Sequence, residues 1–104
     1  MIFRRAPFRD VIARQLDLFV EDDAELLEEC RTKARTYERA PREDAEEAYG
    51  DFVDAVEEAT EALADMRDRF ARTLGGAAAE EYEESFNRAV RRRWPELGLE
   101  IEDR

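Results

Sequence analysis

The residues of this chain whose pattern could do chemistry are carboxylates at helical spacing. Acids three or four residues apart lie on one face of a helix, where two side chains can offer oxygen ligands to one metal ion. They are Glu43 with Glu47, Asp54 with Glu57, Glu58 and Glu61, and Glu80 with Glu84. A ferritin-like di-metal bundle also needs histidine, which the chain lacks, and the acids lie outside its apolar stripes. We therefore expect no metal and no cofactor.

Residues for acid–base or covalent catalysis are equally scarce. Ser85 is the only serine and Cys30 the only cysteine, and no histidine is available to activate either. Gly75 and Gly76 precede a helix without the spacing of a phosphate-binding loop. We expect no catalytic residue and no enzyme activity, and we expect Cys30 to be a small core residue.

The one basic cluster with an aromatic neighbour is Arg91-Arg92-Arg93-Trp94, which could grip phosphates and stack on a base. The chain as a whole has a net charge of −11, and residues 21–66 alone carry 17 acids against five bases. Such a field repels nucleic acid, so we interpret the cluster as cations at a helix C-terminus and expect no nucleic-acid partner.

Length and composition indicate one soluble domain covering residues 1–104. Only four glycines and three prolines interrupt the chain, and 43% of its residues are hydrophobic. The start, Met1 to Ala6, is not followed by the apolar run of a signal peptide, and no stretch approaches the roughly 20 apolar residues of a membrane span. We expect a cytoplasmic protein without a membrane partner.

The elements that must position these residues are organised around one long helix, predicted over about 42–74. Its apolar residues recur at alternating steps of four and three, which is typical of a helix with a single sticky seam. They are Ala45, Tyr49, Phe52, Val56, Ala59, Leu63, Met66 and Phe70. Acids crowd its first turns and arginines (Arg67, Arg69 and Arg72) its last, which suits the helix dipole. Gly50 lies off the seam, where another backbone packs closely or the helix tolerates the loss.

Two further helical stripes precede the long helix. One runs from Phe8 to Val20, and the next from about Asp22 to Arg39, before Pro41. We favour a break at 20–23, with Asp22 as N-cap and Glu25 completing a capping box, over one continuous helix.

A last helix follows Gly75-Gly76 and ends at Trp94-Pro95. In the segment 95–104, Leu97, Leu99 and Ile101 alternate with polar residues, which predicts a short extended piece packed on the bundle or a loose tail used for docking. The predicted fold is all-α: an antiparallel bundle of three to four helices built on the central one.

Partner binding is the function that accounts for most features of this sequence. Long heptad seams associate with themselves or receive a partner helix, so we expect a non-enzymatic protein–protein interaction module, a homodimer or the small subunit of a larger assembly. The candidate interaction surface comprises Phe3, Phe8, Ile12, Tyr82, Phe86 and Trp94. The alternative is an acidic regulator whose 43–65 face occupies a basic, nucleic-acid-binding surface of another protein.

Overall fold

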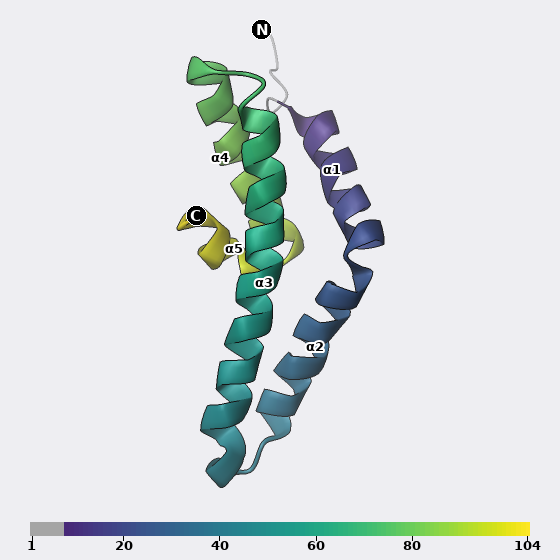
Figure 1. Ribbon diagram of the computed structural model, residues 1–104, viewed down its shortest axis with the longest axis vertical. Coiled ribbons are helices and arrows are strands. Elements are labelled where there is room, and N and C mark those ends of the chain that lie inside the picture. Colours follow the sequence, from purple (N-terminus) through teal and green to yellow (C-terminus); the bar gives the residue numbers. More distant parts are fainter. Residues whose placement is uncertain (1–7) are drawn as a thin grey trace, which may run out of the picture.

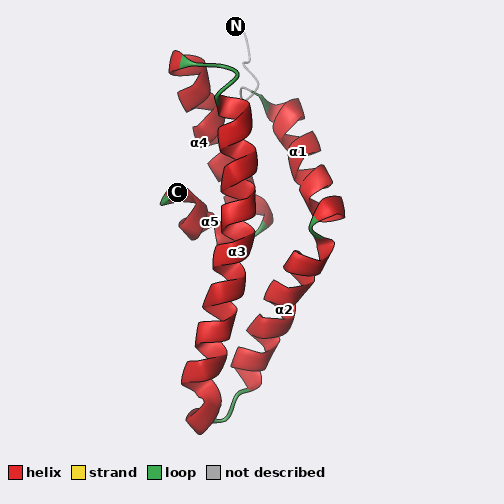
Figure 2. Cartoon of the chain, in the orientation of Figure 1, coloured by secondary structure: helices red, strands yellow, loops and turns green. Residues whose placement is uncertain are grey.

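A computed structural model describes residues 8–104, apart from the side chains of residues 98 and 99. Within that range the chain forms α-helices and one short 3-10 turn, with no strand (Figures 1 and 2). The elements are α1 (Arg9–Asp22), α2 (Ala24–Arg39), η1 (Arg42–Asp44), α3 (Ala45–Ala71), α4 (Gly76–Arg93) and α5 (Pro95–Glu102). The predicted all-α class with a long central helix is confirmed, but residues 8–104 form five α-helices rather than three or four.

The helices are unevenly distributed along α3. In Figure 1, α1, α4 and α5 gather around its upper half, while only α2 accompanies its lower half. The molecule is correspondingly elongated, with extents of 57 × 29 × 24 Å. Gly75, which precedes α4, and Gly76, its first residue, have positive φ angles of 74° and 56°, which explains why the chain reverses there.

The predicted break between the first two helices is present, but its chemistry differs. Asp23, not Asp22, occupies the junction, and no side-chain hydrogen bond caps α2. Backbone bonds span the bend instead: the Asp23 amide donates to the Phe19 carbonyl at 2.8 Å, and the Asp23 carbonyl accepts from the Leu27 amide at 3.1 Å. The bend lets α1 pack on α4 while α2 packs on α3.

The buried face of α3 is wider than its heptad seam. Val56, Ala59 and Leu63 of the seam are buried as predicted, but Tyr49 is 50% exposed. Residues outside the seam are buried as well, because α2 covers one side of α3 while α4 and α5 cover another. They are Ala48, Ala55, Thr60, Ala64, Arg67 and Ala71.

The segment 95–104 packs on the bundle, as one of the two alternatives predicted, but the predicted extended conformation is wrong, because residues 95–102 form α5. Pro95 occupies the first turn of α5, where its missing amide hydrogen costs nothing. Leu97 and Ile101 are both buried, and they lie four residues apart, so one helical face carries them into the core. Alternation at two-residue steps and helical spacing at four coincide for this pair, which is why so short a pattern misled.

Arg67 fastens α5 to the bundle. Its side chain is only 4% exposed. The guanidinium donates to the Asn87 amide oxygen at 3.0 Å and to the carbonyl oxygens of Ile101 at 3.2 Å and Arg104 at 2.9 Å, and Nε pairs with Asp68 at 2.8 Å. The Ile101 carbonyl lies in the last turn of α5 and the Arg104 carbonyl lies two residues beyond its end, so Arg67 complements the dipole of α5 rather than that of its own helix.

Cys30 is buried, as the sequence predicted, and its thiol donates to the carbonyl of Ala55 at 3.3 Å. Burial raises the pKa of the Cys30 thiol, and the nearby charges of Glu29, Glu96 and Glu58 raise it further. This setting keeps the thiol protonated and suits a packing residue rather than a nucleophile.

The structure resolves the question of Gly50. The residue is exposed in the second turn of α3, and a Cβ built there meets nothing within 4 Å. No backbone packs against it, so the helix simply tolerates the glycine. We expect Gly50→Ala to raise the free energy of unfolding by about 0.5–1 kcal/mol, measured by urea denaturation, because alanine is the better helix former. An unchanged or lower stability would contradict this.

Candidate interaction surfaces

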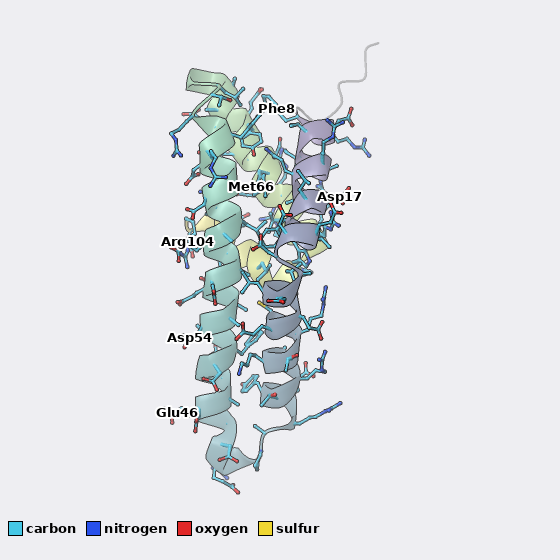
Figure 3. All side chains as sticks on the ribbon, turned by 45° about the vertical axis from the view of Figure 1, so that its right-hand side comes forward. Phe8, Asp17, Glu46, Asp54, Met66 and Arg104 are labelled. Carbon is cyan, nitrogen blue, oxygen red and sulfur yellow. The ribbon has the colours of Figure 1, made fainter. Side chains whose placement is uncertain are left out.

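Four of the residues predicted to form an interaction surface lie in the core instead. Ile12, Tyr82, Phe86 and Trp94 are buried within the single chain, so they are not available to a partner. Phe8 is half-buried against the edge of the Tyr82 ring, with centroids 5.6 Å apart, and Figure 3 shows it at the start of α1. Phe3 lies outside the described residues. The predicted surface residues are buried because α1 and α4 cover each other.

Tyr82 lies at the centre of the contact between α1 and α4. Its ring packs against the ring of Phe8, the N-cap residue of α1. The ring centroids of Phe70 in α3 and Phe86 in α4 lie 4.7 Å and 5.8 Å from that of Tyr82. Its hydroxyl is paired with the amide oxygen of Gln15 at 2.8 Å, so the one polar atom of the cluster is satisfied. The residue holds three helices together.

Burial gives Tyr82 a testable pH dependence. Burial raises the pKa of Tyr82 to about 12, although the Gln15 hydrogen bond opposes the shift. The folded pKa exceeds the unfolded value of 10.0, so the stability that the neutral phenol provides is complete below pH 10 and is lost as pH rises through 12. We expect a loss of roughly 2–3 kcal/mol across that interval in urea denaturation. Tyr82→Phe should lack this loss; an equal loss in the variant would contradict the assignment.

Aromatic side chains do lie at the surface, but on the lower half of α3. Residues 30–56 of α2, η1 and α3 form a two-helix arm, which α5 reaches only from above, through Glu96 and Glu100 (Figure 1). On it Tyr37 is 39% exposed and Tyr49 50% exposed. Tyr37 lies 5.1 Å from Tyr49 and stacks parallel to Phe52 at 6.4 Å, measured between ring centroids.

We define the arm face as Tyr37, Tyr49, Phe52 and Val53. The last three line a hollow of about 150 Å³ that Glu96 and Glu100 of α5 bound on one side. The sequence places Tyr49 and Phe52 in the seam of the long helix, and no local pattern distinguishes a covered heptad from an open one. The missing information was how far α4 and α5 reach along α3.

A groove of about 590 Å³ lies between α1 and α4. Its floor is apolar, and three arginines stand at its rim; the lining comprises Arg9, Ile12, Ala13, Leu16, Ser85, Ala89, Arg92 and Arg93. The Ser85 hydroxyl accepts a hydrogen bond from Arg88 at 3.2 Å. Arg92 and Arg93 belong to the basic cluster seen in the sequence, whereas the contribution of Arg9 depends on the packing of α1.

Acids gather at the junction of α1 and α2. A hollow of about 530 Å³ there is lined by Glu21, Asp22, Asp23, Ala24, Glu25, Leu26, Glu29 and Glu58. Further along α3, Figure 3 shows Glu46 and Asp54 projecting on the side away from α2. Among the residues that the structure describes, no three acid or cysteine side chains are arranged to hold a metal ion.

Comparison of the chain with protein-family models, curated proteins and solved structures found no match. Across the described helices, none is both long enough and apolar enough to cross a membrane.

Proposed function

We propose that this protein is a non-enzymatic interaction module that pairs with a second copy of itself through the arm face. One observation carries the proposal. Two neighbouring tyrosines remain 39% and 50% exposed at the place where the bundle thins to two helices. Tyrosine is enriched at protein interfaces, where its ring supplies apolar area and its hydroxyl a hydrogen bond.

A second copy of the chain is the partner that fits the arm face best. Two two-helix arms packed face to face complete a four-helix bundle, in which each covers the aromatic residues of the other. The edges of the arm also carry opposite charges. Residues 31–39 of α2 carry four bases and one acid, whereas residues 43–58 carry eight acids and no base.

These charges favour one arrangement of the pair. A two-fold axis running along the arms sets α2 of each copy opposite α3 of its partner, which brings basic and acidic edges together. A two-fold axis perpendicular to the arms would set α3 of one copy against α3 of the other and bring their acidic residues together. We therefore propose arms that point in the same direction.

The test is solution mass by light scattering on a sizing column, at low salt and in molar salt. We expect a dimer of the 12.2 kDa chain in both, because apolar burial survives screening. Tyr49→Asp should weaken the dimer at least about tenfold, since it buries an unpaired charge at the interface. Leu18→Asp is the matched control: Leu18 is a 47% exposed apolar residue on α1, away from the arm, and its change should leave the mass unaltered. A wild-type monomer at high concentration would overturn the proposal.

The acidic hollow at the α1–α2 junction favours a second candidate function, binding of a basic protein surface. This function predicts a monomer that binds a poly-arginine peptide at low salt and releases it in molar salt. Survival of the complex in molar salt would count against it.

A further inference from the structure

The groove between α1 and α4 combines features that the proposed self-association does not use. Ile12 and Leu16 form its apolar floor from one face of α1, and Ala89 faces them from α4. Its volume of about 590 Å³ falls within the range of roughly 300–1,000 Å³ that holds small molecules in other proteins.

The arginines stand at opposite ends of this groove. Phe8 contacts Tyr82 near the start of α1 and in the first half of α4, and Asp17 pairs with Arg93 at 2.9 Å further along both helices, so α1 and α4 run parallel. Arg9 consequently lies toward the Ser85 end, and Arg92 and Arg93 lie toward the Leu16 end.

Arg92 and Arg93 differ in their pairing. Arg93 is bound to Asp17 and lies over the Trp94 ring at 5.1 Å, which holds its guanidinium in place. Arg92 makes no ion pair with another residue of the described part of the chain, although the protein has 28 acidic residues. A free guanidinium at the edge of an apolar groove is suited to an anion whose remainder is apolar.

We infer that this groove binds an amphipathic anion: a carboxylate or phosphate head group at Arg92, with Arg93 beside it, and an apolar chain over Ala13 and Ala89, which are the more accessible apolar residues of the lining. The net charge of −11 repels anions from the rest of the surface, so local chemistry must account for any binding. A neutral or cationic molecule of the same shape gains nothing from Arg92 and is not retained.

The test is a titration of the intact protein with octanoate and octyl phosphate, followed by amide chemical shifts in nuclear magnetic resonance. We expect saturable shifts at Ser85 and Ala89 with a dissociation constant of roughly 1 mM or below, as suits ligands of about ten heavy atoms. Octyltrimethylammonium should produce no saturable shift there. Binding of octanoate alone or of octyl phosphate alone identifies which head group the groove takes.

Two variants test the geometry. Arg92→Glu should weaken octanoate binding at least about tenfold, because it replaces a charge-assisted contact with repulsion. Arg72→Glu makes the same change at an exposed residue beyond the end of α3 and should have no effect. Ala13→Trp fills the groove without altering its charge and should also abolish binding, which keeps the inference testable if Arg92→Glu disturbs folding.

Three results would overturn the inference: shifts that do not saturate, equal binding of the cationic detergent, or Arg92→Glu binding like the wild type. If Arg92→Glu instead separates a dimer and no anion binds, the groove is part of an interface between copies. The arm and the groove lie on different elements, so Tyr49→Asp and Arg92→Glu report separately on self-association and on anion binding.

Discussion

Replacing Arg67 by methionine is expected to lower the free energy of unfolding by roughly 3 kcal/mol. Methionine fills similar space, but it leaves the Asn87 amide oxygen and the carbonyls of Ile101 and Arg104 without the donor they have now. Buried acceptors that lose a charged donor incur their full desolvation cost. Urea denaturation followed by circular dichroism gives the free energy, and the fluorescence of Trp94, the only tryptophan, reports on the α4–α5 junction.

Arg69→Met is the control for this change. Arg69 lies two residues further along α3 and is exposed, so the same substitution there should alter stability by less than about 0.5 kcal/mol. Equal effects at both positions would mean that the loss comes from helix propensity or net charge rather than from the bonds to α5.

Ile101→Ala is expected to destabilise the protein by roughly 2–5 kcal/mol, the range for removing a large aliphatic side chain from a packed core. Ile101 is completely buried, although it lies only three residues from the end of the sequence. We expect amide hydrogen exchange of α5 to accelerate more than that of α2, because the loss falls on the contacts that hold α5.

The neighbouring Glu102→Ala tests whether this effect is local to the core. Glu102 is exposed and pairs with Arg91 at the surface, where ion pairs contribute little, so its loss should cost under about 1 kcal/mol. Arg67 and Ile101 meet through one carbonyl, so Arg67→Met and Ile101→Ala together should cost less than the sum of the two. Strict additivity would show that the two residues stabilise α5 independently.

Stability and the proposed function meet in the position of α5. The helix packs on α3 and α4, and its Glu96 and Glu100 form one boundary of the hollow beside Tyr49. Loosening α5 by Ile101→Ala should therefore enlarge the exposed apolar surface next to the arm face. The upper end of the arm is the place where α5 begins to cover α3. The position of α5 therefore determines how much aromatic surface remains exposed for a partner.

The sequence by itself determined the helical class, the central helix and the places where the chain turns. These follow from local physics: apolar periodicity along 42–74, Pro41 before the long helix, and Gly75-Gly76 with the positive φ angles that glycine adopts readily. It also predicted a buried Cys30, because small apolar-like side chains within a helical stripe rarely lie elsewhere.

Tertiary packing alone decided which apolar residues are covered. Phe86 and Tyr49 both lie on apolar helical stripes, yet one is buried and the other half exposed, because α4 packs on both α1 and α3 while α2 alone runs along the lower half of α3 in Figure 1. Arg67 appeared in the sequence as a surface cation, and its burial depends on carbonyls more than 30 residues away. Periodicity reports which face of a helix is apolar; only the reach of the neighbouring helices determines where that face is covered and where it is left for a partner.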